Sequence, residues 1–177
     1  MKSSRNVILA ALVLVAAMPV SAALKDGEKE LTGSFSYRTR DFDDSDFETT
    51  DAQLNVDLGF LLTDNHEVGG RISWFKSEVE SGGESLDADG NAIGAFYHFN
   101  FGMEGSMTPF VGAFYTIVGG DLGDTLDSDY GIEGGLKIYP WDNGGFIVKA
   151  VWDQFTGADD FPDGDGLGLF AGVGLKW

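Results

Sequence analysis

The sequence contains no cysteine, so neither disulfide bonds nor thiolate metal sites are available to it. It has only 4 prolines, and its 11 lysines and arginines stand against 29 aspartates and glutamates, for a formal net charge of −18. Nucleic acids and anionic lipid headgroups both select basic surfaces. This charge therefore argues against a nucleic-acid partner and against a basic helix that lies on a membrane. Beyond the N-terminus, no stretch is apolar enough for a transmembrane helix.

The N-terminus has the organisation of a secretory signal peptide. Lys2 and Arg5 precede an unbroken apolar run from Val7 to Met18, and a small-residue site ending at Ala22 follows. A retained membrane anchor is the alternative, but the run is short of the roughly 20 residues that a span needs. We expect residues 1–22 to be removed and residues 23–177 to form one exported domain.

The last eleven residues, 167–177, alternate between apolar side chains and glycine, phenylalanine or lysine. A side-chain period of two is typical of a strand with one apolar face, and about this length crosses a bilayer when tilted. The same alternation predicts seven further strands, over residues 30–40, 50–62, 67–76, 91–101, 108–118, 129–139 and 145–155. Turn-like connections follow the second, fourth and sixth strands, and longer acidic connections follow the first, third, fifth and seventh. The pattern predicts an all-β, eight-stranded antiparallel up-and-down transmembrane barrel with short periplasmic turns and longer extracellular loops.

Aromatic residues on the apolar faces fall near the two ends of the predicted strands, as in the two interfacial girdles of membrane barrels. A general preference of aromatic residues for strands explains their number but not these two levels. Those near the loop ends are Tyr37, Trp74, Tyr115, Tyr130 and Trp152, and those near the turn ends are Phe60, Phe99, Trp141, Phe146 and Trp177.

Four stretches resemble the OmpA/OmpX-type superfamily of eight-stranded outer-membrane barrels. They are G-F-L-L-T-D-N at 59–65, T-P-F-V-G-A-F-Y at 108–115, Y-G-I-E-G-G-L-K-I-Y at 130–139 and the terminal strand ending on Trp177. The resemblance implies a location in the bacterial outer membrane and contact with its lipid and lipopolysaccharide. It also implies assembly by the barrel-assembly machinery through the C-terminal strand, and we expect a monomer.

Charged residues on the polar faces of the strands are expected inside the barrel. Eight strands leave a lumen just wide enough to be filled by side chains, and enclosed charges must be paired. We predict a lumenal ion-pair network in which Glu133 and Asp57 are the acidic partners. Its expected members are Arg38, Arg40, Asp57, Arg71, Glu133, Lys137, Lys149, Asp153 and Lys176.

This network can be a plug that fills the lumen, or the lining of a narrow ion-conducting pore. We favour the plug, and with it a structural or surface-interaction role for the protein. A barrel that transports a small molecule is the alternative. A soluble lipocalin-like barrel with its apolar face turned inward is the competing fold.

Enzymatic activity is the least favoured function. Some barrels of this architecture modify lipid A with a histidine and a serine near the outer rim. The only histidines here, His66 and His98, fall near periplasmic turns, so we expect no enzyme and no catalytic residue. We expect His98 to be a hydrogen-bonded lumen residue.

The predicted loops are rich in carboxylates, which could bind divalent cations such as calcium weakly. The strongest candidates are Asp159, Asp160, Asp163 and Asp165, although they lack the spacing of an EF-hand. A solvated, repulsive surface is the preferred interpretation, so no specific metal or cofactor site is predicted.

Overall fold

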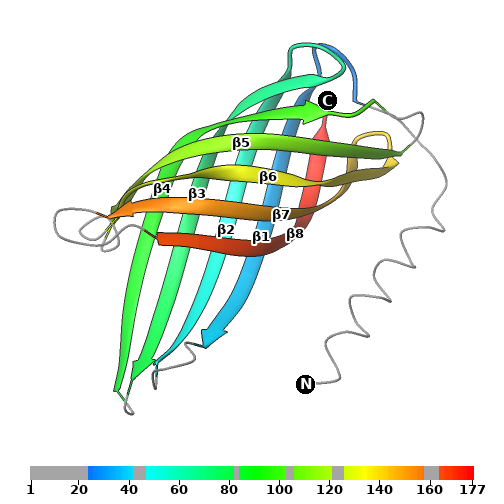
Figure 1. Cartoon of the computed structure of the whole chain (residues 1–177). Coiled ribbons are helices and arrows are strands. Elements are labelled where there is room, and N and C mark those ends of the chain that lie inside the picture. The colour runs from blue at the N-terminus through cyan, green and yellow to red at the C-terminus, as the bar shows by residue number, and fades with distance from the viewer. Residues whose placement is uncertain (1–23, 42–46, 82–83, 103–105, 121–125, 158–163) are drawn as a thin grey trace.

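The computed structural model describes residues 24–41, 47–81, 84–102, 106–120, 126–157 and 164–177. They form a closed barrel of eight antiparallel strands in chain order, which confirms the predicted fold class (Figure 1). No helix in these segments is long and apolar enough to cross a membrane. The predicted signal peptide lies outside the described residues. The strands are β1 (Lys29–Asp41), β2 (Phe47–Leu61), β3 (His66–Ser81), β4 (Glu84–Asn100), β5 (Met107–Gly120), β6 (Leu126–Trp141), β7 (Gly144–Gly157) and β8 (Gly164–Lys176).

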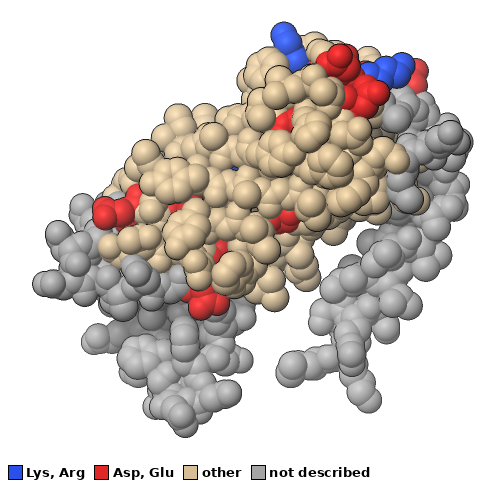
Figure 2. Space-filling view, turned by 45° about the horizontal axis from the view of Figure 1, so that its top comes forward, with Lys and Arg blue, Asp and Glu red and all other residues tan. Residues whose placement is uncertain are grey.

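The apolar faces point outward and the polar faces point into the barrel. On β8, Leu167, Leu169 and Leu175 are exposed, whereas Phe170 and Lys176 are buried. Figure 2 shows the result as a belt largely free of charge, with charged side chains gathered at the two ends of the molecule. The competing fold, which would turn the apolar face inward, is excluded by this arrangement.

The hairpin of β3 and β4 corrects the predicted loop positions. Residues 77–81 and 84–90 were expected in an acidic loop, but they continue the two strands in unbroken register as far as the pair Ser81–Glu84. The prediction stopped at Lys76 because apolar alternation ends there. Beyond an apolar environment, backbone pairing can continue without an apolar face, so the hydrophobic pattern no longer marks the strand. An exposed ion pair between Lys76 and Asp87, 3.9 Å apart, lies in this extension.

The turn end of β6 departs from simple alternation. Ile138 was expected on the exposed face, yet it is only 3% exposed. It stands opposite Met107 on β5 and Phe146 on β7, so two large side chains flank it on the same face. The ladder to β7 also shifts register between Ile138 and Trp141.

The described chain ends lie together at the end of the barrel that carries the short turns (Figure 1). Lys29 and Trp177 exchange two backbone hydrogen bonds of 3.0 and 3.1 Å. Just before β1, the backbone amide of Gly27 donates to the carbonyl of Leu61, 3.0 Å away. This turn places Gly27 at φ 82°, a left-handed conformation that glycine adopts without steric cost.

The seam that closes the barrel is paired over only part of its length. Among the described residues, β1 pairs with β8 from Glu30–Lys176 to Phe35–Ala171 and no further. Both strands continue toward the loop end, β1 to Asp41 and β8 back to Gly164, each paired on its other side. The turn half of the seam is therefore closed and the loop half is open.

Closure of the turn half depends on a glycine that faces the lumen. A side chain at Gly172 would collide with the backbone of Gly33 and Ser34 on β1, whereas Gly33 itself has open space around it. We expect Gly172→Val to lower the free energy of unfolding by about 1–3 kcal/mol, through strain at the seam. Gly33→Val is the matched control and should leave it within about 0.5 kcal/mol. Urea unfolding in lipid vesicles, followed by tryptophan fluorescence, measures both; equal effects would contradict the seam geometry.

Candidate functional site

The centre of the lumen holds a group of four charged side chains around Arg71, here called the Arg71 group. The Arg71 guanidinium donates two hydrogen bonds to Asp57, with Nε–Oδ1 and Nη2–Oδ2 distances of 2.7 and 2.8 Å. Its Nη2 also lies 2.7 Å from Oε1 of Glu133. Lys149 Nζ completes the group at 2.9 Å from Oε2 of Glu133 and 3.5 Å from Oδ2 of Asp57.

The Arg71 group joins opposite walls of the barrel. Asp57 and Arg71 lie on β2 and β3, whereas Glu133 and Lys149 lie on β6 and β7. In a ring of eight strands, β2 faces β6 and β3 faces β7. The Arg71–Glu133 and Lys149–Asp57 contacts therefore join the β2–β3 wall to the facing β6–β7 wall across the lumen. All four side chains are buried, so their charges are compensated by one another.

A second group, here called the Lys137 group, lies nearer the turn end. Lys137 Nζ is 2.6 Å from Oε2 of Glu30 and 2.5 Å from Oε2 of Glu67. The Tyr139 hydroxyl donates to the other oxygen of Glu30 at 2.5 Å, and Asn100 Nδ2 donates to Glu67 at 3.2 Å. One lysine thus balances part of the charge of two enclosed carboxylates, and neutral donors share the rest.

His98 stands between the two groups. Its Nε2 is 2.6 Å from Oε1 of Glu133, and its Nδ1 is 3.4 Å from Oε2 of Glu67. Across both groups, four carboxylates (Glu30, Asp57, Glu67 and Glu133) face three permanent cations and this imidazole. His98 is therefore the lumenal residue that the sequence predicted to be hydrogen-bonded, and it links the two groups into one cluster.

Aromatic rings cover the cluster on the side toward the loops. Phe96, Phe114, Val151 and Phe170 form one buried apolar patch. The Arg71 guanidinium carbon lies 4.9 Å from the ring centre of Phe114 and 5.6 Å from that of Phe96. Cations over aromatic faces gain further stabilisation where water is excluded. The charged side chains are thus covered by the aromatic patch on the loop side and contacted laterally by the groups with which they are paired.

The turn end of the lumen is also covered. Leu24, which precedes β1, is buried against Leu61 and Tyr139. Below the Lys137 group, the Lys176 ammonium lies 4.8 Å from the Tyr139 ring centre and 3.8 Å from Oε2 of Glu28. The chain just before the first strand therefore packs across this mouth of the barrel.

The remaining predicted network members are placed as follows. Asp153 is buried on β7, four residues nearer the loop end than Lys149. The side chains of Arg38 and Arg40 lie outside those described, although their backbone pairs with β2. The structure thus brings Asp57, Arg71, Glu133 and Lys149 into direct contact, and it places Lys137 and Lys176 in separate pairings.

Sequence reasoning missed the acidic partners of Lys137. Glu30 lies on the same strand face as the buried Thr32, and Glu67 on the same face as Arg71, so alternation alone would have placed both carboxylates inward. Both stand at the first positions of the predicted strands 30–40 and 67–76, where alternation has only just begun and the face of a residue is least clear.

The girdle aromatics lie on the outside of the barrel. At the loop-end level, Tyr37, Trp74, Tyr115, Tyr130 and Trp152 are exposed. At the turn-end level, Phe60, Trp141 and Trp177 are exposed, while Phe99 and Phe146 are partly buried. Phe146 packs against Trp141 with ring centres 5.6 Å apart.

The weak cation candidates give no described site. Asp159, Asp160 and Asp163 lie outside the described residues, and Asp165 is exposed on β8. In the part of the chain with described coordinates, no three acidic or histidine side chains are grouped to hold a metal ion.

The fold matches solved eight-stranded outer-membrane barrels. Neisserial surface protein A aligns with a TM-score of 0.61 at 14% identity, covering 86% of this chain and 98% of that one. OprG of Pseudomonas aeruginosa gives 0.56 at 14%, covering 88% and 98%. The N-terminal barrel domain of OprF from the same organism gives 0.51 at 20%, covering 86% and 98%. The sequence matches no model of a known protein family and no curated protein. The likeness establishes the architecture of the OmpA/OmpX type.

The Lys137 group generates a stability prediction. Lys137→Met leaves Glu30 and Glu67 buried without their shared cation, which typically costs about 3–5 kcal/mol. Lys76→Met, which removes the exposed pair with Asp87, is the control and should change stability by less than about 1 kcal/mol. Urea unfolding of both variants in vesicles tests this. Lys137→Met combined with Glu67→Gln should recover part of the loss, and absence of any loss in the single variant would refute the pairing.

Proposed function

We propose that this protein is an integral protein of the bacterial outer membrane with a plugged lumen and a structural or surface-interaction role. The outward apolar belt and the two levels of exposed aromatic side chains support placement in a bilayer. The architecture shared with OprF, OprG and Neisserial surface protein A supports the outer membrane in particular. Lipid and lipopolysaccharide are the proposed surroundings, and the C-terminal strand is the proposed signal to the barrel-assembly machinery.

One observation carries the plug: the Arg71 group crosses the lumen between facing strands. An ion entering here would have to displace side chains that hold each other at 2.7 to 3.5 Å, away from water. The aromatic patch on one side and Leu24 on the other add apolar barriers. Breaking a buried pair without replacing its partner is costly, so the closed arrangement is the stable one.

A non-enzymatic role is part of the proposal. His98 has both ring nitrogens directed at carboxylates inside the cluster. The other histidine, His66, has its Nδ1 2.8 Å from the Tyr97 hydroxyl at the turn end. Neither position offers a histidine to a substrate at the loop end. The exposed carboxylates there, such as Asp87, Asp89, Asp127 and Asp165, form an acidic surface suited to interaction.

Planar-bilayer recording tests the plug. The inserted wild-type protein should give no steady single-channel current, because the lumen is filled. Steady currents whose amplitude changes in Glu133→Gln would show that ions pass the Arg71 group and would overturn the plug. Insertion is verified on the same sample by electrophoresis in SDS, where the folded barrel should migrate differently before and after boiling. A protein without this heat shift would instead contradict the membrane placement.

A second candidate function is lateral passage of a small apolar molecule. The observation that favours it is the unpaired loop half of the β1–β8 seam. Exposed Tyr37 and Leu169 flank this half on the outside, while Ser36 and Gly168 face inward. A molecule entering from the loop end could leave through this seam without crossing the ion cluster.

Cysteine cross-linking tests the open seam, since the chain has no cysteine of its own. Tyr37→Cys with Leu169→Cys would face each other if the seam closed in its existing register. Phe35→Cys with Ala171→Cys is the control pair, which is already opposed. Oxidation in vesicles should join the control pair several-fold more efficiently, because a disulfide needs closely opposed Cβ atoms. Equal cross-linking of the two pairs would eliminate lateral passage.

A further inference from the structure

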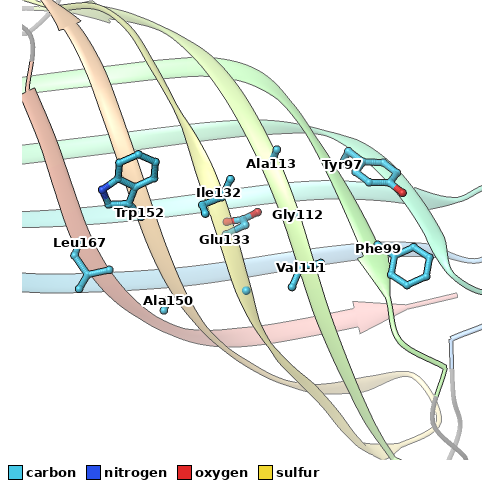
Figure 3. A pocket seen from close by; sticks show the side chains of 11 residues that line it. Tyr97, Phe99, Val111, Gly112, Ala113, Ile132, Glu133, Ala150, Trp152 and Leu167 are labelled. Atoms are coloured by element: carbon cyan, nitrogen blue, oxygen red, sulfur yellow. The ribbon is translucent and has the colours of Figure 1, made fainter.

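The outer surface of the barrel is hollowed across β4 to β8, as Figure 3 shows. The hollow has a volume of about 580 Å³. It lies among residues of the apolar belt and not in the lumen. Glu133 also borders it, but the Glu133 carboxylate is turned inward into the Arg71 group.

Two rows of opposed residues form the hollow. In one row, Tyr97, Ala113, Ile132 and Trp152 stand side by side on consecutive strands. In the next row, Phe99, Val111, Gly134 and Ala150 do the same. The small residues Ala113, Gly134 and Ala150 make the lowest parts of the floor beside the larger Val111 and Ile132, and the aromatic rings make the two ends (Figure 3). The feature is thus a groove that runs across the strands.

We propose that this groove holds one acyl chain of a phospholipid from the periplasmic leaflet, more tightly than the surrounding lipid. The inference rests on the proposed placement in the outer membrane. The groove is continuous with the apolar belt that faces lipid, so lipid acyl chains surround it. Three interstrand spacings of about 4.8 Å separate its aromatic ends and give it a reach of about 14 Å, comparable to one leaflet, or half, of a hydrocarbon core about 30 Å thick.

The polar groups beside the two ends favour the periplasmic leaflet. At the turn end, the Tyr97 hydroxyl and the His66 imidazole, whose Nδ1 lies 2.8 Å from that hydroxyl, carry polar atoms that can hydrogen-bond to a headgroup. At the loop end, the exposed carboxylate of Asp165 stands two residues beyond Leu167, on the same face. A carboxylate repels the phosphate groups of an outer-leaflet lipid, so the headgroup belongs at the turn end.

Packing provides the preference over bulk lipid. Contact between apolar groups in a bilayer gains nothing from the hydrophobic effect, because lipid chains are as apolar as leucine. A chain on a convex barrel wall touches protein on one side only. A chain in the groove touches the floor and both walls, and many small dispersion contacts add up.

Native mass spectrometry in mild detergent, after incubation with phosphatidylethanolamine vesicles, tests the groove. Wild type should retain one phospholipid. Gly134→Leu and Ala150→Leu place a side chain in the floor and should lower the occupancy about tenfold. At Gly134 a Cβ meets only ordinary contacts, the nearest at 3.5 Å, so the substitution should fold.

Gly33→Leu is the matched control, because Gly33 also faces outward, has open space and lies on β1 away from the groove. It should retain phospholipid as wild type does. Equal retention in all variants, retention of lipopolysaccharide in place of phospholipid, or a dimer lost in Gly134→Leu would each overturn the proposal. Every variant must show the heat-dependent mobility shift in SDS, as evidence that it is folded. If the wild type showed no shift, the proposed membrane placement would be wrong, and this outcome is distinguishable from a failure of the groove alone.

Fluorescence quenching tests the orientation of the chain. In a protein with Trp152 as its only tryptophan, made by Trp74→Phe, Trp141→Phe and Trp177→Phe, retained lipid is compared after bromination at two positions. Bromine near the end of the chain should quench Trp152 more than bromine near the headgroup, because Trp152 lies at the loop end of the groove. The reverse order would overturn the assignment to the periplasmic leaflet.

Discussion

The contact between Arg71 and Glu133 is the interaction on which the interior depends. It joins β3 to β6 across the lumen and brings with it the partners of each residue, Asp57 on one wall and Lys149 on the other. The narrow lumen cannot solvate these charges as bulk water would, so each charge must be paired with an opposite charge on a neighbouring side chain. The result is a cross-brace between opposite walls. It fixes the position of those strands more tightly than backbone pairing around the ring does alone.

Much of this could be predicted from period-two alternation, because a strand cannot rotate one side chain without rotating all of them. Alternation placed Arg71, Glu133, Lys137 and Lys149 inside, and it also implied Glu30. It could not assign partners. Which carboxylate meets Lys137 depends on the register of strands far apart in sequence, as the sequence separation of 107 positions from Glu30 to Lys137 illustrates.

Strand boundaries were hardest to predict from the sequence where the outer face of a strand no longer faces an apolar environment. The β3–β4 extension pairs through its backbone, so its side chains carry no alternating apolar signal. The predicted exposure of Ile138 was wrong for a different reason. The large side chains of Met107 and Phe146 on the neighbouring strands cover it, and alternation along one strand carries no information about the residues beside it on other strands. Local pattern thus gives the face of a residue, and only the assembled sheet gives its burial.

The barrel combines a tightly held half with a looser one, and both follow from where its large side chains lie. Toward the turns, the two charge groups and Leu24 fill the lumen, and β1 pairs with β8. Toward the loops, the inward face of β8 carries Gly166 and Gly168, which have no side chain to pack across the seam against β1.

Strand β6 shows how the inside and the outside of the wall are kept independent. Its inward residues Glu133 and Lys137 belong to the charge cluster, while Gly134 between them forms the floor of the outer groove. Because adjacent residues of a strand face opposite ways, the groove can be filled from Gly134 without adding volume to the lumen. The proposed lipid site on the outer wall and the proposed plug in the lumen therefore place separate demands on the same short segment, and each can change while the other is kept.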